Sequence, residues 1–377
     1  MMVKEWIGRW PSEALSQLNS TAGRSRQWKR ICSPKLAAGL DSGAVAGGEP
    51  QRIFTLDVLR GFALFGILVL NVQIYAVPES IMFTMEEKYV DVGRLGEALG
   101  LLSGLLEKKM MGLFSLLFGI STLLITDGAA RKGLTPALIY YRRIVALFLI
   151  GIGHAGIWWG DVLSVYGFCA FPLYFFRRLP AIWLMALGVF FFCALGPVCG
   201  LLWEAGGSPY SHEDILSRAI GMMFLGMATY RWQIVTGEQS LQYYWGMTIA
   251  GFGVGGLQLI APAGTVVGLV AVLASVVGFV GLVILATRAK WLDGLCAWLA
   301  AVGRMAFTNY LMHTVIGFSL ASGEMMPDEQ MVVFLGVMMV QLVLSPLWLR
   351  KFHYGPAEWL WRWVTYWRIP PFKKINE

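Results

Sequence analysis

Three apolar segments of this 377-residue chain carry polar side chains of the kinds that bind ligands or take part in catalysis. In the first segment, Asp57, Arg60 and Asn71 lie on one side of a helix, because a helix turns by about 100° per residue. Ionisable groups are costly inside an apolar segment and often mark a functional site. The pattern therefore predicts an arginine clamp for an anion below a polar centre. The alternative is an interfacial ion pair with an Asn that serves helix packing.

The second segment places a histidine between two cations and a carboxylate. Arg142 and Arg143 precede His154, and Asp161 follows it by two helical turns. In a regular helix, His154 and Asp161 would be about 10 Å apart along the axis, although Gly160 could let the chain bend back. Histidine titrates near neutral pH, which suits a general base. We expect His154 to be such a base and Asp161 to orient either the acceptor or the imidazole. A satisfied core histidine is the alternative.

The third segment places Asn309 and His313 four residues apart, above Arg304. Such a pair shares a helix face, so it predicts either a binding site or a cluster of hydrogen bonds between helices. The helical rise of about 1.5 Å per residue puts Asn71, His154 and His313 about 14–18 Å above an arginine near the start of each segment. A layer of arginines below a band of polar groups suits an anionic, phosphate-bearing molecule whose reactive end reaches that band.

The composition excludes a disordered chain, a coiled coil and an ordinary soluble enzyme. Hydrophobic residues make up 57% of the chain and charged residues only 14%, whereas soluble domains are about 25% charged. Mean hydropathy is +0.62. Stretches of about 18 or more apolar residues predict an all-α polytopic membrane protein, with a bundle of about ten transmembrane helices. A count of nine or eleven spans is the alternative. The ten expected spans lie near 56–77, 108–127, 142–159, 162–177, 181–203, 216–233, 241–260, 264–287, 297–321 and 330–349.

The charges predict how these spans are oriented. The chain has 30 Lys and Arg against 23 Asp and Glu, a net charge of +7. With the N-terminus inside, the basic residues fall in the even-numbered connections and the acidic ones mostly in the odd-numbered connections, as the positive-inside rule requires. We therefore expect an even number of spans with both termini in the cytoplasm. Residues 79–107 would lie outside, with an amphipathic helix near 95–106 at the interface.

The chain divides into three parts by composition. Residues 1–50 predict a disordered basic cytoplasmic tail, residues 51–350 a transmembrane domain, and residues 351–377 a Trp-rich interfacial segment. In the last part Glu358 and Arg362 are an i, i+4 pair, and the alternative is that this segment lines the cytoplasmic mouth of the bundle. The five cysteines show no metal-ligand spacing, so we expect buried thiols and no metal.

Motifs in order along residues 51–370 resemble one bacterial family. They are Leu-Asp57-Val-Leu-Arg60-Gly with a later Asn71, then His154 with Trp159-Gly160-Asp161, then Gly303-Arg304-Met-Ala-Phe-Thr-Asn309-Tyr310, and Tyr354-Gly-Pro-Ala-Glu358-Trp-Leu-Trp-Arg362. The sequence is identified by these motifs as a member of the YeiB-like inner-membrane proteins, whose domain has no assigned function. The resemblance implies a multi-pass protein of the bacterial inner membrane.

The pattern Asp-x-x-Arg-Gly with a later Asn is also similar to the lysosomal heparan-α-glucosaminide N-acetyltransferase and other transmembrane acyltransferases. This similarity implies transfer of an acyl group from cytoplasmic acyl-CoA, such as acetyl-CoA, to an envelope glycan or another hydroxyl or amine acceptor. Asn71 would then polarise the thioester carbonyl. The heparan enzyme has a His after its Asn, whereas residues 71–107 contain none, so His154 or His313 would take that role. The CoA phosphates would be held by Arg60, Arg142, Arg143 and Arg304.

Two further functions fit the same residues. A transporter or flippase for an anionic metabolite or lipid would use the arginine layer without chemistry, and a non-catalytic binding protein would keep only the pocket. His154 and His313 could also be axial ligands of haem, but cytochromes usually bring more ligands, so we do not expect haem. The basic residues lie between apolar spans, so we expect the bilayer rather than nucleic acid as a partner.

Overall fold

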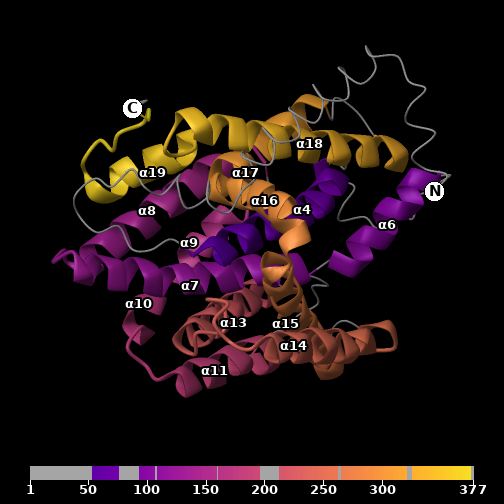
Figure 1. Ribbon diagram of the computed structural model, residues 1–377, viewed down its shortest axis with the longest axis horizontal. Coiled ribbons are helices and arrows are strands. Elements are labelled where there is room, and N and C mark those ends of the chain that lie inside the picture. Colours follow the sequence, from indigo (N-terminus) through magenta and orange to yellow (C-terminus); the bar gives the residue numbers. More distant parts are fainter. Residues whose placement is uncertain are drawn as a thin grey trace, which may run out of the picture.

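The computed structural model describes residues 53–75, 93–106, 108–158, 160–195, 212–261, 265–320 and 325–374. These residues form helices and the turns that join them, and one isolated antiparallel bridge joins Phe352 to Lys373. The predicted all-helical fold is confirmed for this part of the chain (Figure 1). The expected tail at residues 1–50 and the expected outer segment up to residue 92 lie outside the described residues.

Within the described residues, five helices are long and apolar enough to cross a membrane. This agrees with the membrane protein that the composition predicts. They are α4 (Phe54–Tyr75), α7 (Lys109–Arg131), α8 (Pro136–Ala155), α15 (Val266–Arg288) and α18 (Pro327–Lys351). Other helices occupy the remaining expected spans but do not meet this standard, so the count of ten stays a prediction. Among them are α11 (Ala181–Val189), α13 (His212–Arg231) and α14 (Leu241–Gly255).

Two of the expected spans are interrupted rather than continuous. The range 162–177 consists of α9 (Leu163–Ala170) and α10 (Leu173–Phe176), with Pro172 at the break, because proline has no N–H to continue the hydrogen-bond ladder. The range 297–321 consists of the end of α16 (Asp293–Arg304) and of α17 (Ala306–Leu320). The single helices expected there are therefore corrected to pairs of shorter ones.

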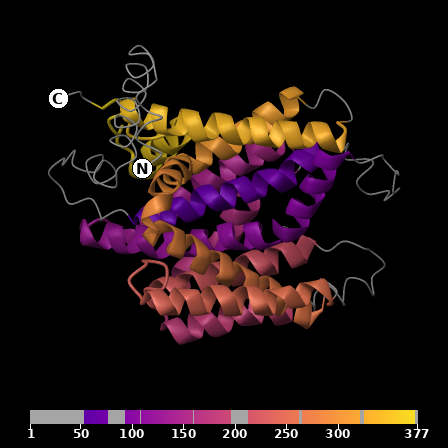
Figure 2. The same cartoon turned by 45° about the vertical axis from the view of Figure 1, so that its right-hand side comes forward.

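Helix α4 runs through the middle of the bundle. Figures 1 and 2 show α18 and α19 (Pro356–Tyr366) on one side of it and α11, α13 and α14 on the other. The expected amphipathic helix is α6 (Arg94–Leu106), whose Leu99 is buried while Leu101 is exposed. It packs beside α18, where the backbone N–H of Gly96 donates to Asp328 Oδ1 at 2.6 Å.

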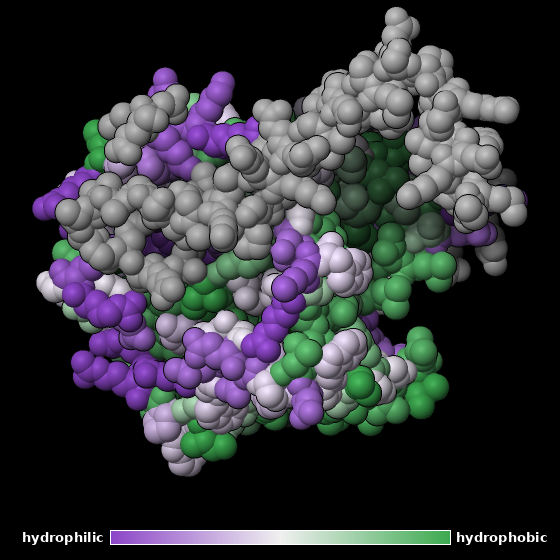
Figure 3. Space-filling view, in the orientation of Figure 1, coloured by the Kyte–Doolittle hydropathy of each residue, from purple (hydrophilic) through white to green (hydrophobic). Residues whose placement is uncertain are grey.

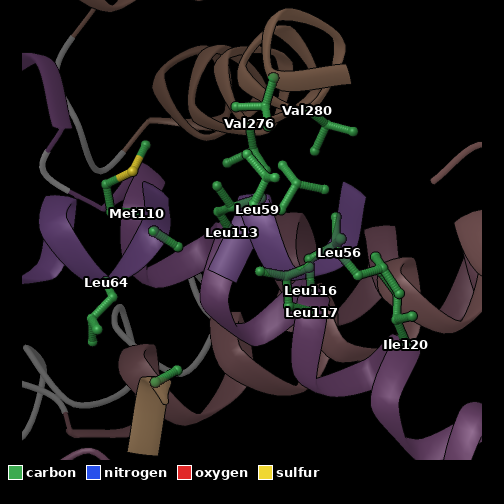
Figure 4. Packing of buried hydrophobic residues seen from close by; sticks show 14 of the residues in the cluster. Leu56, Leu59, Leu64, Met110, Leu113, Leu116, Leu117, Ile120, Val276 and Val280 are labelled. Carbon is green, nitrogen blue, oxygen red and sulfur yellow. The ribbon is translucent and has the colours of Figure 1, made fainter. Parts of the chain in front are cut away.

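Leucine and valine side chains lock α4, α7 and α15 together. Leu56 and Leu59 of α4, Leu113 and Leu117 of α7 and Val276 of α15 are at most 2% exposed and meet in one cluster (Figure 4). Between helices surrounded by lipid, such contacts stabilise mainly through close packing, because the lipid tails are as apolar as the side chains.

The outer faces of several helices are apolar as well. Leu149 of α8, Ile182 of α11 and Ile249 of α14 are more than 60% exposed, which is what helices facing lipid require. Figure 3 shows apolar side chains mainly on the right of one face, with hydrophilic ones on the left and in a run through the lower middle.

Two glycines let α4 and α16 touch along their backbones. A Cβ atom on Gly61 would collide with the carbonyl oxygen of Leu299, and one on Gly303 would collide with that of Asp57. This close crossing, of the kind that small residues permit in membranes, brings Arg60 and Arg304 to the same level of the bundle.

Candidate functional site

Arginines from four helices line a cavity of about 280 Å³. Arg60 comes from α4, Arg143 from α8, Arg304 from the end of α16 and Arg362 from α19, and Glu358 of α19 lies among them. The remaining walls are mostly apolar and aromatic, including Phe114, Leu117, Phe118, Leu147, Phe307 and Trp361. Four guanidinium groups against one carboxylate give the lining a net positive charge, so it favours an anionic ligand with an apolar part.

Arg60 takes part both in an ion pair and in this lining. Its Nη1 donates to Asp57 Oδ1 at 2.9 Å, and its Nη2 donates to Ser121 Oγ at 3.1 Å. The two alternatives weighed for this segment are therefore compatible: the ion pair forms, and it orients the guanidinium toward the cavity.

Arg142 and Arg143 separate, although they are adjacent in the chain. The guanidinium of Arg143 stacks 3.5 Å above the Trp361 ring, and Trp361 Nε1 donates to the backbone oxygen of Arg143 at 2.9 Å. Arg142 instead stacks at 4.5 Å on Trp367, outside the lining. The expectation that both hold one ligand is corrected here, because consecutive helix residues point about 100° apart.

The Trp-rich C-terminal segment forms one wall of the cavity, and the expectation that it lines the cytoplasmic mouth of the bundle stays a prediction. Glu358 accepts hydrogen bonds from the backbone N–H groups of Phe307 at 2.7 Å and Thr308 at 3.0 Å, and from the Thr308 hydroxyl. These are donors left free at the start of α17. Burial raises the pKa of the Glu358 carboxyl, and the bonds from Thr308 and Phe307 act against that rise.

The His154 and Asp161 side chains meet behind the inner end of the cavity. His154 Nδ1 lies 2.8 Å from Asp161 Oδ1, and both side chains are at most 5% exposed. The contact forms because α8 ends at Ala155 and the chain turns back into α9, where Asp161 accepts the backbone N–H groups of Leu163 at 3.1 Å and Ser164 at 2.8 Å. The chain thus leaves the helix at Ala155, five residues before the Gly160 at which a bend is considered, and this brings together two groups that a regular helix would keep apart.

This contact sets the tautomer of the imidazole. Asp161 accepts two backbone N–H groups and so acts as a carboxylate, which makes Nδ1 of His154 a donor. Nε2 then has a free lone pair, and it lies 2.9 Å from Thr314 Oγ1 of α17. In this tautomer His154 Nε2 accepts a hydrogen bond from the Thr314 hydroxyl.

Tyr310 stands between this base and the cavity. Its ring lines the inner end of the cavity, together with Leu163 and Tyr166, and its centroid lies 5.5 Å from that of His154. His154 is thus one side chain behind the cavity wall rather than part of it.

Asn71 lies with two aromatic residues on the other side of His154. The ring of Tyr75 packs against that of Trp158 at 4.8 Å, and the Trp158 ring is 6.1 Å from His154. The Tyr75 hydroxyl lies near Asn71 and Thr314, but not in hydrogen-bond geometry with either side chain. Asn71 Nδ2, Tyr75 Oη and Trp158 Nε1 are buried and have no hydrogen-bond partner among the described residues.

Asn309 and His313 lie on a different face of α17. His313 Nε2 bonds Gln341 Oε1 at 3.0 Å, Gln341 donates to the backbone oxygen of Asn309 at 3.1 Å, and Asn309 donates to Ser345 Oγ at 3.1 Å. Asn309 and His313 share one face of α17, as their spacing predicts. That face packs on α18, and neither residue lines the cavity. The structure therefore forms the hydrogen-bond cluster between helices that was the alternative for this pair.

The sequence does not assign three of the site residues. Thr314 is 160 positions from His154, and Ser121 and Tyr310 meet their partners from separate helices. Tyr310 and Thr314 carry a signal in the sequence, because both belong to the polar run that contains Asn309 and His313.

Comparisons with known proteins agree with the motifs. The family model described as "Protein of unknown function (DUF418)" matches residues 228–368. The "Uncharacterized protein YxaH" of Bacillus subtilis (strain 168) is 30% identical over 397 residues, covering 86% of this chain and 96% of that protein. The "Uncharacterized protein YeiB" of Escherichia coli (strain K12) is 26% identical, covering 84% of this chain and 96% of that protein. The chain therefore belongs to the YeiB-like DUF418 family.

Proposed function

We propose that this protein is an acyltransferase of the bacterial inner membrane, with both termini in the cytoplasm. It would move an acyl group, such as acetyl, from cytoplasmic acyl-CoA to a hydroxyl or amine of an envelope glycan or similar acceptor. The observation that supports this is the buried His154–Asp161 pair directly behind the inner end of an arginine-lined cavity.

The cavity suits one part of the donor. Arg60, Arg143, Arg304 and Arg362 would hold its phosphates through charge-assisted hydrogen bonds. At about 280 Å³ the cavity is slightly smaller than most ligand pockets, which span roughly 300–1,000 Å³. The aromatic walls would thus enclose the pantetheine arm and the acyl group, while the adenine end stays outside.

His154 would supply the base for the transfer. Its Nε2 accepts the proton of the attacking hydroxyl or amine, whose oxygen or nitrogen bonds to the thioester carbonyl carbon. The carbon–sulfur bond breaks, and the CoA thiolate takes the proton back from the imidazolium. Asp161 stabilises the imidazolium, and Asn71 would polarise the carbonyl. Because Tyr310 separates cavity and base, its ring must turn aside when the thioester enters.

Purified protein in detergent, supplied with radiolabelled acetyl-CoA and extracted envelope glycans, tests this proposal. We expect label on the glycan fraction, and we expect His154→Ala to lower the rate roughly 10²–10⁴-fold, about 3–5 kcal/mol of barrier. His313→Ala is the matched control, because His313 is an equally buried histidine of the hydrogen-bond cluster on α18. Loss of turnover in His313→Ala alone would mean that the base is misassigned, and absence of turnover in the parent would refute the acyltransferase.

One observation favours a second candidate, transport of an anionic metabolite or lipid. The break between α16 and α17 lines the cavity through Gly303, Arg304 and Ala306, and interrupted helices are typical of transporter binding sites. Proteoliposomes that take up a labelled anion with no acyl transfer would support this candidate over the enzyme.

A further inference from the structure

Thr314, His154 and Asp161 are joined by two successive hydrogen bonds. Asp161 Oδ1 lies 2.8 Å from His154 Nδ1, and His154 Nε2 lies 2.9 Å from Thr314 Oγ1. Counted as whole residues, Asp161 is 8%, His154 6% and Thr314 2% exposed. A hydroxyl on a histidine that a carboxylate orients is the arrangement that activates serine and threonine nucleophiles. We propose that Thr314 is the nucleophile that carries the acyl group between two half-reactions, an inference that rests on the proposed acyltransferase function.

The direction of the Thr314 hydroxyl supports this role. Buried hydroxyls on helices usually donate to the carbonyl oxygen one turn earlier, and in this chain Ser115, Thr126 and Thr248 do so at 2.8–2.9 Å. Thr314 is equally buried and helical, yet its hydroxyl bonds the imidazole of another helix. With Nδ1 of His154 bound to Asp161, the Thr314 hydroxyl is the donor in this contact and Nε2 is its acceptor.

The unpartnered donors beside Thr314 supply a second, independent observation. Buried polar atoms in folded proteins almost always have a hydrogen-bond partner, but Asn71 Nδ2, Tyr75 Oη and Trp158 Nε1 have none among the described residues. The Tyr75 hydroxyl lies near Thr314 and Asn71 but outside hydrogen-bond geometry, and Trp158 packs on both Tyr75 and His154. Donors held free beside a nucleophile are what a developing oxyanion requires.

The two half-reactions balance without any further reactant. In the first, Thr314 Oγ bonds to the thioester carbonyl carbon, His154 Nε2 takes the hydroxyl proton, and Asn71 with Tyr75 donates to the oxyanion. The carbon–sulfur bond breaks, and the thiolate leaves with the proton as CoA, which leaves an ester on Thr314. In the second, the acceptor hydroxyl or amine gives its proton to His154 and attacks the ester, and Thr314 Oγ leaves and regains the proton.

Such an ester would also explain how the acyl group passes Tyr310. Tyr310 and Thr314 are one turn apart on α17, so the hydroxyl lies about 6 Å farther from the arginines than the residue that ends the cavity. An acyl group on Thr314 would have left the donor cavity, and the acceptor could reach it from the side of Tyr75 and Trp158.

Exchange between labelled CoA and acetyl-CoA in the absence of acceptor distinguishes this pathway from direct transfer. With full-length protein, an acyl-enzyme predicts exchange and one acetyl group on the peptide that contains Thr314, detected by mass spectrometry after acid quenching. Thr314→Val should lose both signals, and Thr314→Ser should retain them. Thr248→Val, which also removes a buried helical hydroxyl, should leave both unchanged.

The outcomes separate this inference from the proposed function. A parent protein that transfers label to glycans but shows neither exchange nor an acetylated peptide would refute the role of Thr314 and leave His154 as the base of a direct transfer. Acetyl found on His154 or elsewhere would do the same. A parent with no transfer, no exchange and no acetylated peptide would refute the acyltransferase itself. If Thr314→Val fails to fold, the parent protein alone still tests the role of Thr314, through CoA exchange and through the acetylated peptide.

Discussion

At the residue scale, one turn of α8 shows how neighbouring side chains receive different roles. Arg143 lines the cavity and stacks on Trp361, whereas Arg142 stacks on Trp367 outside it. Both side chains are half-buried and both lie on a tryptophan of the same segment. The two side chains carry the same charge, so a difference between them in ligand binding must come from the direction in which each leaves the helix.

We predict that Arg143→Ala weakens acyl-CoA binding by about 1.5–3 kcal/mol, the value of a hydrogen bond to a charged group. Arg142→Ala, the matched control, should bind acyl-CoA as the parent does. Equilibrium binding of labelled acetyl-CoA to the detergent-solubilised variants measures the difference, and thermal unfolding checks that both are folded. Equal loss of affinity in the two variants would place the phosphates outside the cavity.

At the element scale, the break between α16 and α17 is stabilised by side chains from elsewhere. The backbone oxygen of Val302 accepts Asn309 Nδ2 at 3.2 Å, and Glu358 accepts the N–H groups of Phe307 and Thr308. An interrupted helix inside a membrane is tolerated only where such groups find partners. Helix α19 therefore does more than lie at the surface, because it caps α17 and forms one wall of the cavity.

Glu358→Ala should destabilise the protein by about 0.5–2 kcal/mol, because it removes the N-terminal cap of α17. Glu329→Ala is the control: Glu329 accepts the N–H of Met326 at 2.9 Å at the start of α18, but it is exposed. We expect thermal unfolding in detergent to shift clearly for Glu358→Ala and little for Glu329→Ala. Identical midpoints for the two variants would show that α19 does not hold the break.

At the scale of the whole molecule, membrane orientation decides whether the arginine end faces a cytoplasmic donor. Lys132 follows α7 and is exposed, whereas Glu86 belongs to the segment expected outside. The basic residues gather in alternate connections, which predicts that these two positions lie on opposite sides of the membrane. Of two cysteines introduced there, only one should therefore react with a membrane-impermeant thiol reagent applied to intact cells. The Glu86→Cys protein should label and the Lys132→Cys protein should not, with the parent's native cysteines as background. Equal labelling would contradict the proposed topology and with it the proposed direction of transfer.

The sequence by itself determined the features that depend on neighbours along a helix. Apolar stretches indicated the membrane helices, and the spacing of Asp57 and Arg60 indicated their ion pair. The shared face of Asn309 and His313 followed from the same periodicity. The family also followed, because its motifs lie in order along the chain. These properties are local, since 3.6 residues per turn and the apolar length of a span require no knowledge of other helices.

Only the tertiary structure decided which of these faces form the site. Asp161 reaches His154 because α9 packs back on α8, and Thr314 reaches it across 160 positions. The sequence did not predict the break at Met305 or its cap from Glu358 for the same reason, because the groups that stabilise the break come from a distant helix. His313 was placed in the site by depth alone, but depth fixes only the position along a helix axis. The azimuth that turns Thr314 toward His154 and His313 toward Gln341 is set by how α17 packs between its neighbours.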